Sequence, residues 1–176
     1  STKQEQQELL NIVIVGGGAT GIEVAGILSE MKKFVLPNDY PDMSSSLMHI
    51  YLIEAGPRLL AGMSEESSAH AEQFLREMGV NILLNKRVVD YRDHKVLEDG
   101  TEIATRTFIW VSGVTGVTIG NLDASLIGRG GRIKVDSFNR VEGMNNVFAI
   151  GDQCIQLADE NYPNGHPQLA QVASQQ

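Results

Sequence analysis

Four short runs of consecutive apolar residues divide the first 113 positions, and longer mixed stretches separate them. The runs are NIVIV (11–15), MHIYLIEAG (48–56), VNILLN (80–85) and TFIWVSG (107–113). Continuous apolar runs rich in β-branched residues are typical of parallel strands that are buried on both faces. We therefore expect these runs to form a parallel sheet, with Trp110 in the core and not stacked on a ligand.

The stretches between the runs predict helices and one loop. Residues 3–10 form a short polar lead-in with helical character, and apolar positions at helical spacing extend from Ala19 to about Lys33. Residues 34–47 contain two prolines, two aspartates and three serines, so we expect a loop there. Residues 64–79 predict an amphipathic helix that Ser64 caps and Gly79 ends.

A different pattern begins after residue 85. Residues 86–113 alternate polar and apolar positions, and Asp99-Gly100 is a hairpin signal. The first half of the chain therefore follows β–α–β–α–β, then a small antiparallel excursion, then a parallel strand. This order predicts the α/β class, with a Rossmann-like, doubly wound sheet.

After Gly113 the chain is rich in glycine and loop-like. RIKVD, NRV and NVFAIGD predict short strands of an incomplete second domain. The chain starts without Met and ends in QVASQQ, within an expected helix, so we expect a segment of a longer protein.

Charge and composition narrow the function. The net charge of −8 and the low pI of 4.9 argue against nucleic-acid binding. Cys154 is the only cysteine, and the four histidines show no metal-ligand spacing, so we expect no metal site. No apolar run reaches the length of a bilayer span, and we expect this segment to be soluble.

The glycine-rich stretch GGGATG supplies the strongest chemical signal. Gly16, Gly18 and Gly21 satisfy G-x-G-x-x-G, directly after a predicted strand and at the start of a predicted helix. In a dinucleotide site the first glycine permits the tight turn, the second lets the pyrophosphate approach, and the third lets helix and strand pack closely. The helix N-terminus then attracts the phosphates. The alternative is a glycine turn that holds no ligand.

A second requirement of such a site is an acidic residue at the end of the next strand. Glu54 fits, although it lies 33 residues after Gly21 because the predicted loop lengthens the connection. A carboxylate there binds ribose hydroxyls and repels the 2′-phosphate of NADP, so we expect a preference for NAD. Nearby Arg58 could weaken that preference, and a solvated strand end is the alternative for Glu54.

Glu23 lies among apolar neighbours near the start of the expected helix. Within the first turn, its charge would stabilise the helix dipole by about 0.3–1 kcal/mol. The functional alternative is that it faces the nicotinamide end of a ligand. Motif and spacing alone do not decide between the two.

Several motifs in order resemble one family. IVIVGGGATGIEVAGILSEM, LPNDYP, IYLIEAGPRLL, VFAIGDQC and HPQLAQVASQQ look like the type II NADH dehydrogenases, which are NADH:quinone oxidoreductases with two dinucleotide-binding domains. The resemblance implies that residues 9–115 form the NADH domain and residues 116–176 a returning segment of the FAD domain. The family's first FAD motif and its membrane-binding C-terminal region are absent from this sequence.

The resemblance also implies roles for individual residues. Glu54 would hold the adenosine ribose, and Glu23 would lie beside nicotinamide and flavin. The NADH pyrophosphate would be held by Gly16, Gly18, Ala19, Thr20 and Gly21.

Further along the chain, Gly113 matches the family glycine that lets NADH pass close to the end of the strand. Gly151 and Asp152 match the motif whose aspartate binds the ribityl or pyrophosphate part of FAD. Gln171 and Gln175 match glutamines near flavin and quinone, and their spacing puts them on one helix face. An ordinary polar helix face is the alternative for this pair.

For the parent protein, the resemblance implies hydride transfer from NADH to FAD and then electron transfer to a quinone. It implies a peripheral location on the cytoplasmic side of the inner membrane, with a homodimer as an open option. Two alternatives remain: a module that only binds NADH, or a parent that reduces ferredoxin, a peroxide or a sulfide-linked acceptor.

Overall fold

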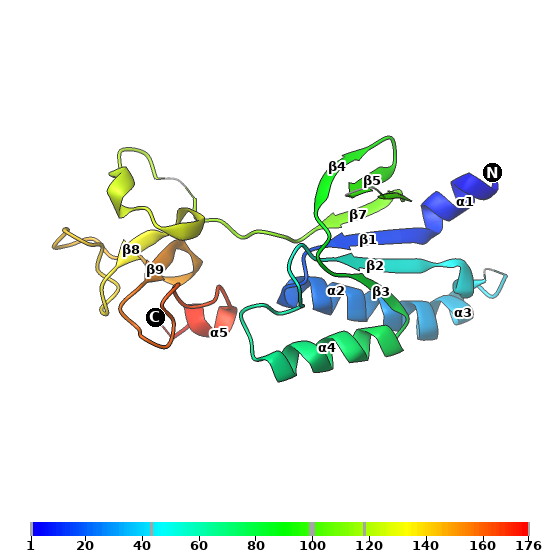
Figure 1. Cartoon of the computed structure of the whole chain (residues 1–176), viewed down its shortest axis with the longest axis horizontal. Helices are drawn as coiled ribbons and strands as arrows, with labels where there is room; N and C mark the ends of the chain where they lie inside the picture. The colour runs from blue at the N-terminus through cyan, green and yellow to red at the C-terminus, as the bar shows by residue number, and fades with distance from the viewer. Residues whose placement is uncertain (1, 43, 99–100, 118, 176) are drawn as a thin grey trace. The chain divides into compact units, whose positions relative to one another are not determined.

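A computed structural model of the chain describes residues 2–42, 44–98, 101–117 and 119–175 (Figure 1). The chain divides into two compact units, Ser1–Ser112 and Gly113–Gln176. Separate clusters of buried apolar residues stabilise the two units. The assignment of residues 9–115 to an NADH domain and 116–176 to a FAD-domain segment stays a prediction.

A four-stranded parallel sheet forms the centre of the first unit, in the order β3-β2-β1-β7. All four predicted apolar runs contribute a strand, so this part of the prediction is confirmed. The strands are β1 (Asn11–Val15), β2 (His49–Ile53), β3 (Val80–Leu83) and β7 (Thr107–Trp110).

Different layers cover the two faces of this sheet (Figure 1). On one face Ile14 and Leu52 pack in a cluster with Ala25 and Leu75 from helices α2 (Ala19–Glu30) and α4 (Glu65–Glu77). On the other face Val13 and its neighbours pack against a small antiparallel sheet. Burial on both faces explains why the strands read as continuous apolar runs.

The antiparallel sheet has the order β4-β5-β6, which confirms the predicted excursion. Its strands are β4 (Val88–Arg92), β5 (Lys95–Glu98) and β6 (Thr101–Ala104). Asp93 and His94 connect the first two strands and both have positive φ, +49° and +59°, as the central residues of a tight hairpin turn require. The predicted turn residues Asp99-Gly100 lie outside the described part of the chain.

The prediction for Trp110 is wrong. Its side chain is 57% exposed, and its indole N–H donates to the carbonyl of Ser112 at 2.8 Å. Trp110 ends β7, which lies at an edge of the parallel sheet and pairs only with β1 among the named strands. An edge position leaves one side of the strand without a neighbour.

Two predicted helices are present, and a third helical segment extends further than the sequence indicates. The lead-in forms α1 (Lys3–Leu10), and Ser64 is the N-cap of α4, where its side chain accepts a hydrogen bond from the Ser67 amide. After α2 the chain forms a π-helical turn, Met31–Val35, and then α3 (Leu36–Asp39). The predicted loop at 34–47 is therefore wrong up to Asp39.

Pro37 lies at a position where a helix accepts proline. Proline is tolerated in the first turn of a helix, where its missing N–H has no intrahelical acceptor. The irregular connection is thus limited to the stretch around a 3-10 turn at Ser45–Leu47.

The second unit contains little regular structure. Strands β8 (Ile133–Val135) and β9 (Cys154–Gln156) pair in parallel, and helix α5 spans Ala170–Ala173. Short 3-10 helices occupy Ala124–Leu126, Arg129–Gly131 and Gly151–Gln153. RIKVD contains β8 as expected.

Two strand predictions in the second unit are wrong. The NRV and NVFAIGD segments make only isolated bridges, Val135 with Val141 and Arg140 with Phe148. The fold class itself is confirmed, because the first unit is a parallel α/β sheet with an antiparallel excursion. Within the described ranges, each helix falls short of the length and apolarity that a bilayer crossing requires.

Candidate functional site

The glycine loop connects β1 to α2 through very close backbone contacts. Gly16 has a φ of +119°, and its amide donates to the carbonyl of Ile53 at 2.9 Å. A Cβ atom on Gly16 would lie 2.9 Å from the backbone nitrogen of Ser112, and one on Gly21 would collide with the carbonyl oxygen of Gly16. Both positions therefore require glycine for the turn and for helix packing.

Gly18 has different surroundings. It is exposed, it has an ordinary φ of −77°, and a Cβ atom there would meet no atom within 4 Å. It is also the N-cap of α2, whose first amides have no acceptor within the helix. The protein therefore leaves open space beside a set of amide donors and the positive end of a helix dipole, which is suited to an anion. Ala19 and Thr20 begin this helix.

The carboxylate of Glu54 bonds to the backbone of the glycine loop. One oxygen accepts the Gly17 amide at 2.6 Å and the other accepts the Gly56 amide at 2.7 Å. The backbone of Glu54 is held on both sides, because its amide donates to Leu83 at 2.9 Å and its carbonyl accepts from Lys86 at 3.0 Å. Glu54 thus lies directly beside the turn, as the spacing argument requires.

The segment after Glu54 folds back over the glycine loop. The amide of Leu60 donates to the carbonyl of Gly17 at 2.8 Å, and the side chain of Leu59 is fully buried. The guanidinium of Arg58 donates to carbonyls of the same segment, at 3.0 Å to Met63 and 2.9 Å to Ala61. Arg58 is therefore held by backbone carbonyls of this segment.

Glu23 lies on the exposed side of α2, four residues after the first helical residue, Ala19. The first turn of α2 contains no acidic residue, so the expectation of a first-turn position is wrong. The dipole effect falls off within the first turn, which weakens the purely structural explanation of this side chain.

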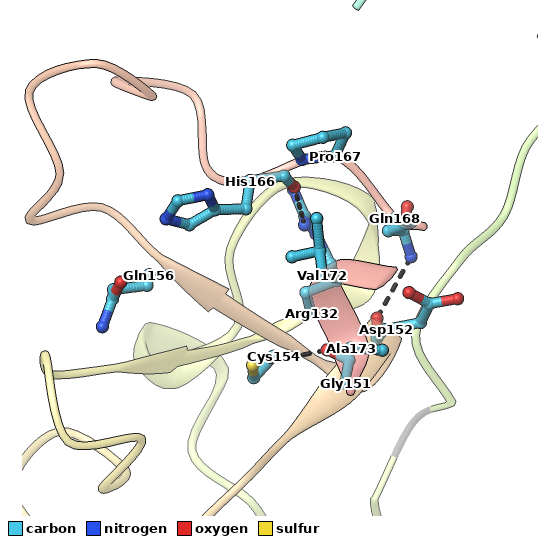
Figure 2. Close-up of a pocket in the computed structure, with 10 residues that line it drawn as sticks. All are labelled: Arg132, Gly151, Asp152, Cys154, Gln156, His166, Pro167, Gln168, Val172 and Ala173. Atoms are coloured by element: carbon cyan, nitrogen blue, oxygen red, sulfur yellow. Dashed lines mark hydrogen bonds between the residues drawn. The ribbon is translucent and has the colours of Figure 1, made fainter. Parts of the chain in front are cut away.

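The second unit holds the other group of candidate residues. Gly151 has a φ of +67° and begins the 3-10 helix that precedes β9. The side chain of Asp152 is exposed, and its carbonyl accepts from the Gln168 side chain at 3.1 Å. Figure 2 shows these residues around a pocket that Arg132 and Cys154 also line. The cavity measures only about 10 Å³, the space of a single water.

Arg132 is a residue of this pocket that sequence reasoning missed. It is 8% exposed, and its guanidinium donates to the carbonyl of His166 at 3.0 Å (Figure 2). Burial lowers the pKa of Arg132, since desolvation disfavours the charged form. GGRIKV carries no motif that would single out this arginine before the fold is known.

The two glutamines are not paired on one helix. Gln171 lies in α5, whereas Gln175 follows the helix in a turn that its amide closes onto the Val172 carbonyl at 3.1 Å. Both side chains are exposed. The predicted i,i+4 helix face is therefore wrong, because α5 ends at Ala173.

Gly113 begins the second unit with a φ of +84°, and a Cβ atom there would meet nothing within 4 Å. The left-handed conformation requires glycine at this point of the chain. Elsewhere in the described residues, no group of three or more His, Cys, Asp or Glu side chains is arranged to hold a metal.

Known proteins share this chain's sequence and fold. The type II NADH:quinone oxidoreductase of Haemophilus influenzae is 33% identical over 161 residues, covering 90% of this chain and 36% of that protein. The type II NADH:quinone oxidoreductase NdhA of Mycobacterium tuberculosis is 33% identical over 158 residues, covering 84% and 34%. The chain thus spans about a third of the length of these curated relatives.

A solved structure has the same fold. NDH2 from Plasmodium falciparum, in complex with NADH, superimposes with a TM-score of 0.72 and 24% identity, covering 89% of this chain and 34% of that one. The resemblance to type II NADH dehydrogenases is confirmed by these matches. The family described as pyridine nucleotide-disulphide oxidoreductase matches residues 1–176. The chain therefore belongs to the pyridine nucleotide-disulphide oxidoreductase family.

Proposed function

We propose that the first unit binds NADH at the glycine loop. The observation that carries the proposal is the open space at Gly18, next to the free amides at the start of α2. A pyrophosphate fits there, because the amides and the helix dipole attract its charge and no side chain fills the space. The family and the NADH named in the related structure's description support the same ligand.

The residues of the glycine loop and Glu54 have different roles in this proposal. Gly16 and Gly21 form the close turn, and Gly18 lets the pyrophosphate approach the backbone. Ala19 and Thr20 provide amides of the first helical turn. Glu54 uses one lone pair of each oxygen on a backbone amide, so it has further lone pairs for the ribose hydroxyls.

We also propose that NADH is preferred to NADPH. The Glu54 carboxylate would repel a 2′-phosphate on the adenosine ribose. Arg58, the nearby cation, uses N–H donors of its guanidinium on the backbone carbonyls of Ala61 and Met63. Fewer of its donors are therefore left to bind a 2′-phosphate directly.

For the whole protein we propose an FAD-dependent NADH:quinone oxidoreductase. The names of the relatives from H. influenzae and M. tuberculosis support this activity, which stays a proposal because the chain covers about a third of their length. Gly151 and Asp152 would hold part of FAD, since an exposed carboxylate after a glycine turn can accept hydrogen bonds from ribityl hydroxyls. When bound, FAD supplies the chemistry that accepts hydride from NADH and releases electrons to the quinone.

The remaining candidate residues have roles that rest on the family resemblance. Glu23 would orient the nicotinamide amide, and Gly113 would let NADH reach the strand end. Gln171 and Gln175 would lie near flavin and quinone. A peripheral place on the cytoplasmic face of the inner membrane and a homodimer belong to the same proposal.

Titration calorimetry of the 176-residue chain with NADH and NADPH tests the binding proposal. We expect saturable NADH binding, weaker NADPH binding, and a rise in thermal stability with NADH. At a ligand concentration one hundred times Kd, mass action adds about 2.7 kcal/mol to the free energy of unfolding. No binding and no thermal shift at millimolar NADH would contradict the proposal.

The full-length protein tests the catalytic proposal. Its NADH oxidation with menadione as acceptor should depend on bound FAD, and Glu23→Gln should change the rate or the KM for NADH. A Glu23→Gln enzyme with unchanged rate and KM would remove Glu23 from the proposed site.

A further inference from the structure

Arg58 organises the backbone of the segment that follows Glu54. Its Nη1 donates to Met63 at 3.0 Å and to Leu60 at 3.4 Å, and its Nη2 donates to Ala61 at 2.9 Å. Three carbonyls of one short segment thus converge on a single guanidinium. The planar, multidentate donor set of arginine suits such a cluster, whereas a lysine ammonium is a compact point donor.

The segment held in this way includes a residue in an unusual conformation. Leu60 has a φ of +47°, which a branched side chain rarely adopts without support from its surroundings. Arg58 and the hydroxyl of Ser68, which donates to the Leu59 carbonyl at 2.6 Å, supply that support from the two sides. In this conformation the Leu60 amide donates to Gly17.

Gly17 is consequently held at both of its backbone polar groups. Glu54 accepts its amide at 2.6 Å, and Leu60 donates to its carbonyl at 2.8 Å. A Cβ atom at Gly17 would also lie 2.7 Å from the Leu59 side chain, so the backbone at Gly17 is closely packed. Because Gly17 precedes the exposed Gly18, these contacts fix the direction in which the first amides of α2 point.

We propose that Arg58 is a positioning residue for the nucleotide pyrophosphate, acting through Leu60 and Gly17 and not by touching the nucleotide. This inference rests on the proposed function, since it assigns the support of the same NADH site. Preorganised donors bind better than donors that must be ordered on binding. Loss of Arg58 should therefore weaken ligands that carry a pyrophosphate and leave those without one unaffected.

Calorimetric titration of the 176-residue chain with ADP-ribose, and saturation-transfer NMR with adenosine, test this inference. We expect Arg58→Ala to weaken ADP-ribose binding about tenfold, the effect of one or two supporting hydrogen bonds, and to leave adenosine binding unchanged. Arg92→Ala is the matched control, because Arg92 is an exposed arginine of the same unit that pairs with Asp90. It should bind both ligands as the unmodified chain does.

Amide hydrogen exchange separates positioning from unfolding. In Arg58→Ala the Leu60 amide should exchange faster while the β1 amides keep their protection. If Arg58→Ala does not fold, Arg58→Lys decides, because a single ammonium should recover only part of the ADP-ribose affinity. Equal ADP-ribose affinities for the unmodified chain and a folded Arg58 variant would overturn the inference alone. Failure of the unmodified chain to bind ADP-ribose would overturn the proposed function and the inference with it.

Discussion

The two units of the chain differ in how completely they bury their sheets. In the first unit, helices cover one face of the parallel sheet and an antiparallel sheet covers the other. In the second unit, β8 and β9 pair over three residues each, and the buried apolar cluster contains Ile133, Val135, Val141, Ala149 and Cys154. The first unit is therefore a Rossmann-like structure whose parallel sheet is covered on both faces, and the second unit has a smaller buried core.

This difference also separates the two candidate sites. The glycine loop depends on backbone groups that a complete sheet and its first helix position, and its hydrogen bonds lie within the first unit. Gly151 and Asp152 follow a short, partly exposed segment, and the cavity beside them has the volume of one water. The backbone amides of the glycine loop are therefore positioned by a sheet that is covered on both faces.

The first prediction concerns the third glycine of the motif. A methyl group on Gly21 would collide with the Gly16 carbonyl oxygen, which belongs to backbone that cannot move aside. We expect Gly21→Ala to lower the free energy of unfolding of the first unit by about 3 kcal/mol. Urea denaturation followed by circular dichroism measures it, with Gly18→Ala as the control. Equal stability of these two variants would contradict the geometry of the loop.

A second prediction compares the two cores. Leu52 is fully buried in the first unit, and Leu52→Ala should cost about 2–5 kcal/mol. Val141 is 2% exposed in the core of the second unit, where Val141→Ala removes fewer side-chain carbons and should cost about 1–2 kcal/mol. Amide exchange should show each loss in its own unit. Loss of protection in both units from either variant would show that the two cores unfold together.

The smallest effect is a pH dependence in the second unit. Asp136 accepts the amides of Phe138 at 2.8 Å and Arg140 at 3.0 Å, and these bonds hold the pKa of its carboxyl below the ordinary value of 3.8. A lowered folded-state pKa gives stabilisation that is complete above the unfolded pKa, about 3.9, and is lost as pH falls through the folded value. NMR titration of the Phe138 and Arg140 amides measures it, and Asp136→Asn should abolish the transition. A midpoint above 3.9 would contradict this explanation.

Patterns with a strong physical cause were readable from the sequence. Buried strands such as NIVIV require apolar residues on both faces, and Ser64 and Gly79 have the chemistry of helix ends. Glu54 directly follows β2, as the sequence indicated, and its predicted binding of ribose stays a prediction. Each of these signals is local or has a fixed period.

Other features depend on contacts that a sequence does not display. The helical continuation through Pro37 relies on its place in the first turn of α3, whereas a proline in a polar stretch usually indicates a loop. Trp110 is exposed at the end of β7, and the position of β7 at the edge of the sheet is known only from the strand order. The engagement of Arg58 by Ala61 and Met63 arises from backbone folding and has no motif.

The central claim is that the open space at Gly18 holds the pyrophosphate of NADH. Gly18→Val tests it directly, because a Cβ atom at this position meets no protein atom within 4 Å and Gly18 has an extended backbone conformation that valine accepts. Calorimetry should show NADH binding to the unmodified chain and none to Gly18→Val, while the unfolding free energy falls by only about 1 kcal/mol at the helix N-cap. Unchanged NADH affinity in a folded Gly18→Val chain would contradict the claim.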